Sequence, residues 1–228
     1  MNEKNHELKK IVIIGAGGQG KDVLWTIMDI NKISSRFDII GFLDDDKKLH
    51  GKTINRVPVL GGMNWLSNKN KMGCIIAVGD GKIREKIVKK LKNVNVYFPS
   101  IIHPSVIMSD FVTIGKGTIL HAGVMIPPDS EIGNFVFINL RSQIGHDCKI
   151  KDFVSIMAGV NVTGETIIEN GAYLGSGVTV ADKIKIGEWS IIGIGSAIGK
   201  DVKPYSLYLG NPGIFIRKIK DEKSRPRL

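Results

Sequence analysis

Residues 132–149 read IGNFVF INLRSQ IGHDCK, three six-residue units that each begin with isoleucine. The same pattern runs from Ile102 to Lys203 as seventeen consecutive hexapeptides, and every first position is aliphatic. A period of six fits neither the roughly 3.6-residue repeat of an α-helix nor the two-residue alternation of a strand. It is typical of a parallel β-helix, in which short strands and tight corners recur and one aliphatic side chain per face points inward. The repeat therefore predicts an all-β, β-helical C-terminal half.

Stacked coils convert single aliphatic residues into continuous ladders, which offsets the entropy lost when each short strand is ordered. The fifth position of the unit is small or β-branched, as in Val106, Ser130 and Val154, and we expect it to turn inward near a corner. Glycine holds the second position in seven units, which we interpret as a need for positive φ at the corners. At three units to a coil, the stretch makes nearly six coils, roughly 27 Å tall, without a long excursion loop.

A chain of 228 residues is long enough for one large or two modest domains. We expect an α/β domain at residues 1–99, the β-helix at 100–205 and a C-terminal tail at 206–228. The two cysteines lie in apolar stretches, which favours free thiols and a reducing cytoplasm. The polar start of the chain and the shortness of its apolar runs predict neither a signal peptide nor contact with a membrane.

The formal net charge of +10 suggests an acidic partner. Nucleic acid is one candidate, but the basic residues are dispersed apart from a tail at 217–227, and few aromatic residues lie among them. A polyphosphorylated small molecule explains the charge equally well, and so does a solvated, solubilising surface. We expect no nucleic-acid partner.

The N-terminal half begins with a buried strand at 9–14, a glycine-rich turn at 15–20 and a helix at 21–30. Gly15, Gly17 and Gly20 occupy the glycine positions of a G-x-G-x-x-G motif in the strand–turn–helix context that the motif requires. Amides exposed at the start of such a helix can hold a pyrophosphate. A second strand at 37–43 ends in three aspartates, where an acidic residue would reach a ribose hydroxyl.

A third strand at 74–78 precedes a Gly-Asp-Gly turn and a helix at 82–91, and residues 99–104 join the two halves. Roughly ninety residues are too few for a dinucleotide domain, which needs two mononucleotide halves. We therefore predict a half-Rossmann domain that binds a mononucleotide or a nucleotide sugar, and we do not expect a dehydrogenase. A glycine turn that serves only strand-to-helix packing is the alternative on this motif alone.

His146 differs from the other four histidines. It is third in its hexapeptide, where side chains tend to point outward, and Asp147 follows it directly. A histidine whose tautomer is fixed by a carboxylate can act as a general base, and a surface pair with no role is the alternative. His103 and His121 lie near corners, where we expect structural roles. The other ligands that a zinc site needs do not surround His146, so no metal is expected.

Five motifs together resemble the NeuD/PglD-like sugar acetyltransferases, a family of hexapeptide-repeat acyltransferases. The resemblance covers the chain from about residue 10 to residue 217, and each motif is weak when taken by itself. The motifs are Gly15-Ala16-Gly17-Gly18-Gln19-Gly20-Lys21, Gly41-Phe42-Leu43-Asp44-Asp45-Asp46, Ala77-Val78-Gly79-Asp80, Ile144-Gly145-His146-Asp147-Cys148 and Gly210-Asn211-Pro212-Gly213.

The resemblance implies a left-handed parallel β-helix that forms a homotrimer with active sites between adjacent subunits. It implies acetyl-CoA as co-substrate and a nucleotide-linked 4-amino sugar, carried by UDP or dTDP, as acceptor in bacterial surface glycan synthesis. On this model His146 is the base, Asp147 orients it, and the Gly164 amide stabilises the oxyanion. The implied acceptor-binding residues are Gly17, Gly18, Gln19, Asp44, Asp45 and Asn139, and the implied coenzyme-binding residues are Ser155, Gly164, Ser176, Ile194 and Pro212.

Two positions depart from the family pattern, since Gln19 and Ser155 stand where the family often has histidine. The same scaffold could instead acetylate a hydroxyl, on sialic acid or on another sugar. A non-catalytic trimeric module that binds a nucleotide sugar is a second alternative. Nucleic-acid binding through the basic tail is a third alternative, and the non-catalytic module and nucleic-acid binding both rank below the enzyme.

Overall fold

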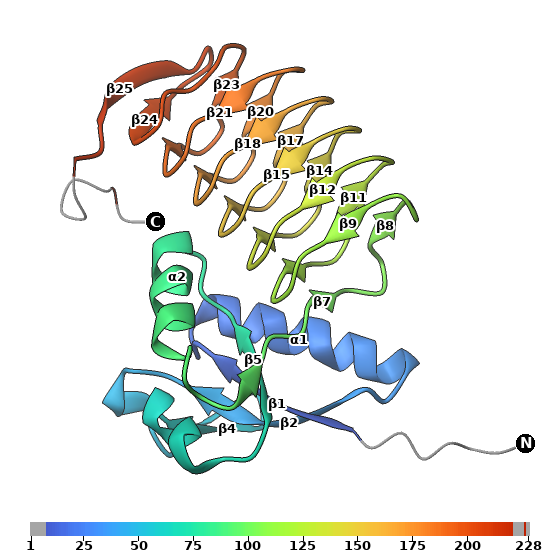
Figure 1. The fold of residues 1–228 in the computed structure, drawn as a ribbon, viewed down its shortest axis with the longest axis vertical. Coiled ribbons are helices and arrows are strands. Elements are labelled where there is room, and N and C mark those ends of the chain that lie inside the picture. Colours follow the sequence, from blue (N-terminus) through green and yellow to red (C-terminus); the bar gives the residue numbers. More distant parts are fainter. Residues whose placement is uncertain (1–7, 221–225, 227–228) are drawn as a thin grey trace, which may run out of the picture.

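The computed structural model describes residues 8–220 and residue 226, and it contains both expected units. In Figure 1 the stacked coils of a parallel β-helix lie above an α/β unit that holds both α-helices. The predicted fold class, a Rossmann-like region followed by a β-helix, is confirmed. Part of the basic tail at 217–227 lies outside the described residues.

The α/β unit is built on one sheet with the strand order β3-β4-β2-β1-β5-β6. All of its neighbouring strands are parallel except the β3–β4 pair, which is antiparallel. Its elements are β1 (Lys9–Ile14), α1 (Gly18–Ile33), β2 (Phe37–Leu43), η1 (Lys47–Leu49), β3 (Thr53–Ile54), β4 (Val57–Gly61), η2 (Met63–Asn68), β5 (Met72–Ile76), α2 (Gly81–Lys90) and β6 (Val96–Tyr97).

The strand order places a topological switch point between β1 and β5, because the chain runs outward from β1 on one side of the sheet and from β5 on the other. The glycine-rich turn follows β1 and the Val78–Asp80 loop follows β5, so both loops lie at this switch point. The sheet holds two parallel strands, β4 and β6, that the sequence did not predict. β4 contains Pro58, which has no N–H to donate to a neighbouring strand, and a proline argues against a strand when only the sequence is known.

The β-helix has three parallel sheets, here named faces A, B and C. Face A contains β7 (Ile101–Ile102), β10 (Ile119–Leu120), β13 (Phe137–Ile138), β16 (Ser155–Ile156), β19 (Tyr173–Leu174) and β22 (Ile191–Ile192), extended by β24 (Ser206–Leu209) and β25 (Ile214–Lys218). Face B contains β8 (Ile107–Met108), β11 (Met125–Ile126), β14 (Gln143–Ile144), β17 (Asn161–Val162), β20 (Thr179–Val180) and β23 (Ala197–Ile198). Face C contains β9 (Thr113–Ile114), β12 (Glu131–Ile132), β15 (Lys149–Ile150), β18 (Ile167–Ile168) and β21 (Lys185–Ile186).

The register confirms the hexapeptide prediction. Phe137 pairs with Ser155 and Ile138 with Ile156, so one coil takes three hexapeptides. The aliphatic first position of each hexapeptide is the second residue of a strand, and from Leu120 onward these side chains form one buried ladder. Four-residue corners join the faces. Those between faces A and B are the AB corners (139–142 in one coil), those between B and C the BC corners (145–148), and those between C and A the CA corners (151–154).

The second-position glycines do not have the positive φ that we expected. Positive φ instead falls at the fourth position of the hexapeptide, at Gly117 and Gly123 and also at Asp129 and Asp147. Five of the seven second-position glycines are instead needed for close stacking of the coils. A Cβ on any of these five would lie 2.4 to 2.8 Å from a backbone atom of the next coil, namely on Gly115, Gly133, Gly145, Gly175 and Gly187.

This packing predicts that Gly115→Ala destabilises the β-helix. The new Cβ would lie 2.5 Å from the Gly133 carbonyl carbon, and backbone cannot move aside as a side chain can. We expect a loss of about 1–3 kcal/mol in the free energy of unfolding, measured by chemical denaturation. Gly199→Ala is the matched control, since a Cβ there meets nothing within 4 Å. Equal stability of the two variants would contradict this explanation.

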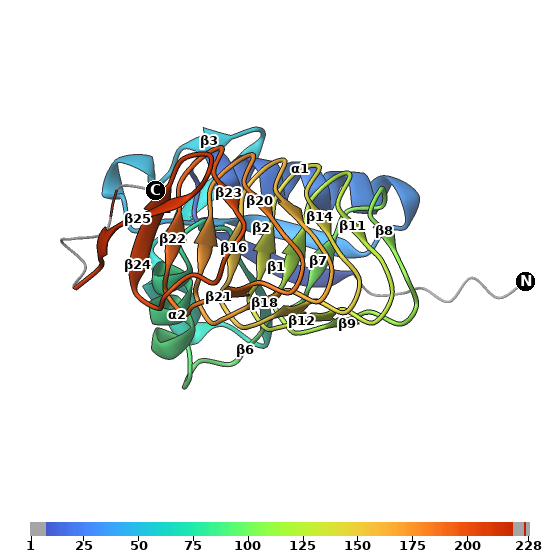
Figure 2. The same ribbon diagram turned by 90° about the horizontal axis from the view of Figure 1, so that it is seen from above.

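The α/β unit packs on face A. Ile101, Ile119 and Phe137 of face A share one buried cluster with Ile27 of α1. In Figures 1 and 2, α1 extends along the direction in which the coils stack. His103 contacts Asp29 through Nε2 at 3.1 Å, and His121 Nδ1 lies 2.8 Å from the Thr26 hydroxyl. Both histidines thus join the β-helix to α1, as expected of structural residues, but His121 Nε2 is buried without a hydrogen-bond partner among the described residues.

His121 predicts a loss of stability in acid. Burial, together with the nearby His103, lowers its pKa from 6.5 to about 4. Between these two values the unfolded chain binds a proton that the folded chain does not, so stability falls as the pH drops from 6.5 toward 4. The full effect is about 3 kcal/mol. We expect the melting temperature to drop less between pH 7 and pH 5 in His121→Gln than in the unchanged protein. An identical drop would contradict the assignment to His121.

Candidate active site

His146 and Asp147 form a hydrogen-bonded pair on a BC corner. The His146 Nδ1 lies 2.7 Å from Asp147 Oδ2, and the two side chains are 61% and 54% exposed. Asp147 has a φ of 56°, the left-handed conformation of the fourth hexapeptide position. An ionised carboxylate only accepts hydrogen bonds, so Nδ1 carries the proton and the Nε2 lone pair is available to accept one. The pair therefore has the arrangement of an oriented general base.

Gly164 lies directly against the His146 ring, at the same corner of the next coil. A Cβ on Gly164 would lie 2.6 Å from His146 Nε2, so only glycine leaves room for the imidazole in this position. Within the described part of the chain, the Gly164 amide makes no hydrogen bond. A proton acceptor and an open backbone donor thus lie side by side, which is the combination that acyl transfer through an oxyanion needs.

A groove of about 620 Å³ runs along face B beside this corner. Its lining is mainly apolar, and it ends at the residues that flank the His146 ring. The lining residues are Ile107, Met108, Ser109, Met125, Ile126, Pro127, Gln143, Ile144, Gly145, Asn161, Val162, Thr163 and Gly164. Side chains of this kind suit the apolar arm of a coenzyme or the surface of a second copy of the chain.

The glycine-rich turn forms an open site at the start of α1. Gly15 has a φ of 103°, and a Cβ on Gly20 would lie 2.1 Å from the Gly15 carbonyl oxygen, so these two glycines make the tight strand–helix turn. A Cβ on Gly17 or Gly18 would meet nothing within 4 Å. Gly17 and Gly18 are also exposed, and the first amides of a helix can hold an anion.

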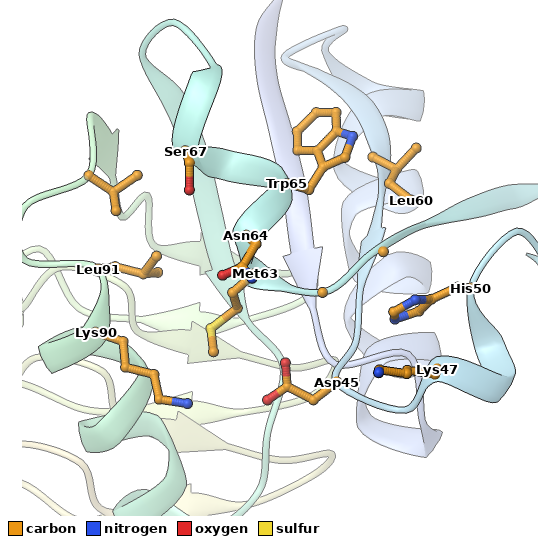
Figure 3. Close-up of a pocket in the computed structure, with 13 residues that line it drawn as sticks. Asp45, Lys47, His50, Leu60, Met63, Asn64, Trp65, Ser67, Lys90 and Leu91 are labelled. Carbon is orange, nitrogen blue, oxygen red and sulfur yellow. The ribbon is translucent and has the colours of Figure 1, made fainter.

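Asp44 and Asp45 both follow β2 but have different surroundings. Asp44 Oδ2 accepts a hydrogen bond of 2.8 Å from the Ala16 amide and so braces the glycine-rich turn. Asp45 lines a pocket of about 850 Å³ between η2 and the C-terminal end of α2. Figure 3 shows Lys47 and His50 on one side of this pocket, and Lys90 with Asn64 on the other.

Sequence reasoning identified Asp45 alone among the residues of this pocket. The other lining residues come from η1, the end of β4, η2, the end of α2 and the turns beside them, where no motif marks them. They are Lys47, His50, Leu60, Gly61, Gly62, Met63, Asn64, Trp65, Ser67, Lys90, Leu91 and Val94. The mixture of cations, a carboxylate and an indole suits a ligand that carries both a planar ring and negative charge.

Gln19 and Asn139 lie on the side of the molecule where the α/β unit meets the AB corners. Gln19 packs beside Gly79 and Met157, and Met157 is stacked one coil beyond Asn139. The Gln19 Oε1 is buried without a hydrogen-bond partner among the described residues. Asn139 is largely buried, and its Oδ1 accepts a hydrogen bond of 2.7 Å from the Leu140 amide.

The residues predicted to bind coenzyme lie in different places. Ser176 and Ile194 are stacked on the AB corners, where the Gly195 amide bonds to the Ser176 carbonyl oxygen at 2.9 Å. Pro212 lies in the turn before β25, which is anchored by a 2.7 Å bond from the Gly213 amide to Ala197. Ser155 is on face A under the α/β unit, 1% exposed.

Within one chain, the predicted site is divided. His146, Asp147 and Gly164 are on the BC corners, whereas Asn139, Ser176 and Ile194 are on the AB corners. Face B separates the two corners, and the α/β unit covers face A, which is opposite the BC corners in a three-sided prism. The structure thus brings the predicted catalytic residues together but does not place them next to Asn139, the predicted acceptor contact on the AB corner of the same chain.

Among the described residues, no cluster of three His, Cys, Asp or Glu side chains is positioned to hold a metal ion. In the same part of the chain, no helix combines the length and the apolar character needed to cross a membrane.

Comparisons with known proteins match both units. Residues 10–91 match the PglD N-terminal domain. The UDP-N-acetylbacillosamine N-acetyltransferase of Bacillus subtilis is 30% identical over 123 residues, which are 49% of this chain and 51% of that protein. The chain therefore spans about half the length of this curated relative.

Solved structures are similar over nearly the whole chain. The acetyltransferase domain of PglB from Neisseria gonorrhoeae has a TM-score of 0.84 and 28% identity, covering 91% of this chain and 100% of that one. PerB from Caulobacter crescentus, solved with CoA and GDP-perosamine, has a TM-score of 0.82 and 26% identity, with coverage of 92% and 99%. The chain thus joins a region similar to the PglD N-terminal domain to a β-helix similar to that of these acetyltransferases, and its expected resemblance to the NeuD/PglD-like sugar acetyltransferases is confirmed.

Proposed function

We propose that the protein is an acetyl-CoA-dependent N-acetyltransferase that acts on a nucleotide-linked amino sugar. The observation that carries this proposal is the BC corner, where an oriented histidine base lies against a glycine amide that has no partner within the described chain. The names of the relatives agree with it, since one is a UDP-sugar N-acetyltransferase and another was solved with CoA and GDP-perosamine. The PglB domain was also solved with acetyl coenzyme A.

The chemistry follows from this corner. The sugar amine attacks the thioester carbonyl carbon of acetyl-CoA, and His146 Nε2 takes the proton that the amine nitrogen loses. The Gly164 amide donates to the oxyanion that forms on the carbonyl oxygen. When the carbon–sulfur bond breaks, the thiolate leaves with the proton from His146, which yields the N-acetyl sugar and CoA. Asp147 holds the imidazole in the required tautomer throughout.

The α/β unit is the proposed acceptor-binding site. The open amides at Gly17 and Gly18 suit the diphosphate, and the pocket beside Asp45 suits the base and ribose. We propose UDP or dTDP as the nucleotide and a 4-amino sugar as the acceptor, for surface glycan synthesis. Gln19 and Asn139 lie between the glycine-rich turn and the AB corner and are the proposed contacts to the sugar.

The division of the site supports a homotrimer. Asn139 and His146 belong to the same coil and so lie at the same height along the prism axis, with face B between them. If copies pack side by side with parallel axes, the BC corner of one copy meets the AB corner of the next at matching height. The base of one chain then faces the acceptor held by its neighbour, and the groove on face B is covered.

Thiol release from acetyl-CoA tests the proposal directly. It should be measured over a panel of UDP-, dTDP- and GDP-linked amino sugars together with hydroxyl-bearing sugars that include sialic acid. We expect release only with the amino sugars, and mass spectrometry should find one acetyl group on the sugar nitrogen. Release with hydroxyl sugars alone would establish O-acetylation instead. Nucleotide-sugar binding without any binding of acetyl-CoA would identify a non-catalytic module.

A further inference from the structure

Arg84 on α2 is one of the most completely buried side chains in the described protein, 1% exposed. Its guanidinium bonds to both units. Nη1 donates to the carbonyl oxygens of Val78 at 2.8 Å and Gly79 at 3.0 Å. The remaining bonds reach the β-helix, with Nε donating to Phe135 O at 2.9 Å and Nη2 to Phe153 O at 2.8 Å, Val154 O at 2.9 Å and Ser155 Oγ at 3.1 Å.

The six acceptors that this buried cation has among residues 8–220 include no carboxylate oxygen. Burial lowers the pKa of Arg84 to about 9, and only the charge of Asp80 opposes this shift. An apolar side chain of similar volume often packs as stably as a buried charge. Five N–H groups in a fixed planar fork, however, can hold several carbonyl groups in one geometry, which no apolar residue can do. The geometry of the carbonyl groups is therefore the property that arginine supplies here.

The carbonyl groups held on the α/β side belong to the Val78–Asp80 loop. Gly79 O also accepts a 2.7 Å hydrogen bond from Ser155 Oγ, so two donors fix it. A Cβ on Gly81 would lie 2.2 Å from Phe153 O, which leaves no space between the end of this loop and the β-helix. Arg84 and Ser155 thus hold the loop against the coils.

This loop flanks the glycine-rich turn at the switch point of the sheet. A Cβ on Gly15 would lie 2.8 Å from Ala77 O, and the Gln19 side chain packs beside Gly79. Because a peptide is planar and trans, Arg84 also directs the Gly79 N–H away from itself when it holds Val78 O. Ligands of open α/β sheets bind in the crevice at the switch point, so a shift of this loop would change the crevice itself.

We propose that Arg84 is a positioning residue for the nucleotide-linked acceptor, which it serves by holding the Val78–Asp80 loop in place with the help of Ser155. This proposal rests on the proposed function. It assigns Ser155 to the acceptor side of the reaction, although the family resemblance places a coenzyme contact at this position. The two assignments differ in which Michaelis constant Ser155 affects.

Steady-state kinetics with both substrates test the proposal. The variants are Arg84→Met, which removes the hydrogen bonds, Arg84→Lys, which keeps the charge without the planar fork, and Ser155→Ala. Lys89→Met is the matched control, because it removes a cation from the exposed side of the same helix. We expect the acceptor KM to rise about tenfold or more in Arg84→Met and less in Arg84→Lys. Ser155→Ala should raise it severalfold. The KM for acetyl-CoA should stay within about twofold in every variant, and Lys89→Met should resemble the unchanged protein.

Three results would overturn the proposal. An unchanged acceptor KM in a folded Arg84 variant is the first, and a proportional change in both Michaelis constants is the second. A rise in the acetyl-CoA KM alone in Ser155→Ala is the third. If Arg84→Met fails to fold, Arg84→Lys and Ser155→Ala decide the question. If the unchanged protein transfers no acetyl group, the proposed function fails, and calorimetry with UDP, dTDP and GDP then compares nucleotide binding by the same variants. If every variant binds the nucleotides with unchanged affinity, the positioning role proposed for Arg84 is also wrong.

Discussion

His146→Ala is expected to lower kcat by about 10²–10⁴-fold while both Michaelis constants change little. A positioned general base contributes a factor of this size, and within the described part of the chain the exposed imidazole makes one side-chain hydrogen bond, to Asp147. The proposed binding sites for the two substrates should therefore stay intact. Thiol release from acetyl-CoA, measured at saturating concentrations of both substrates, gives the value.

The fold should not change in this variant, because the His146 side chain is 61% exposed and supports no core packing. Thermal unfolding of His146→Ala provides that control. Asp147→Asn should lower kcat by a smaller factor, because the amide no longer requires the tautomer with the proton on Nδ1. A loss of less than tenfold in His146→Ala would remove His146 from the mechanism.

Gly164→Ala is expected to lower kcat by about a hundredfold without unfolding the protein. The added methyl group would lie 2.6 Å from His146 Nε2, so the imidazole has to move by roughly an ångström, and displacements of this size cost about that factor. The backbone amide of residue 164 remains in the variant. The loss in kcat therefore measures the effect of displacing the His146 imidazole.

Gly199→Ala again supplies the matched control, since it adds the same methyl group at a BC corner where nothing lies within 4 Å. Its kcat should equal that of the unchanged protein. Full activity in Gly164→Ala would show that the imidazole works from a position other than the one in this structure.

The β-helix could be predicted almost residue by residue, because each coil repeats the same local requirement. Every aliphatic first position from Ile102 to Ile198 is the second residue of an observed strand. The role of the second-position glycines could not be predicted, because the clash that excludes a side chain comes from the next coil, eighteen residues away in the register. The spacing of the repeat does not show how closely the backbones of two neighbouring coils approach each other.

The α/β unit was predictable where a motif marked it and not elsewhere. The glycine-rich turn and the aspartates after β2 are local signals, and both lie where the sequence placed them. Arg84, by contrast, looks like an ordinary solvated residue within the charged run of α2, and only its tertiary contacts reveal its burial. The pocket beside Asp45 was missed for the same reason, since its walls come from three separate segments.

In the proposed mechanism, the base of one copy acts on an acceptor held by another copy. Mixing two inactive variants tests this claim directly. His146→Ala lacks the base, and Gly18→Glu places a negative charge where the diphosphate is proposed to bind. The fold should tolerate this charge, because acidic residues stabilise a helix start and a Cβ on Gly18 meets nothing within 4 Å. Gly18→Gln is the neutral control. When the two variants are refolded together, mixed assemblies should regain acetyl transfer, because some sites then combine an intact BC corner with an intact glycine-rich turn. Mixed assemblies that form but stay inactive would contradict the account.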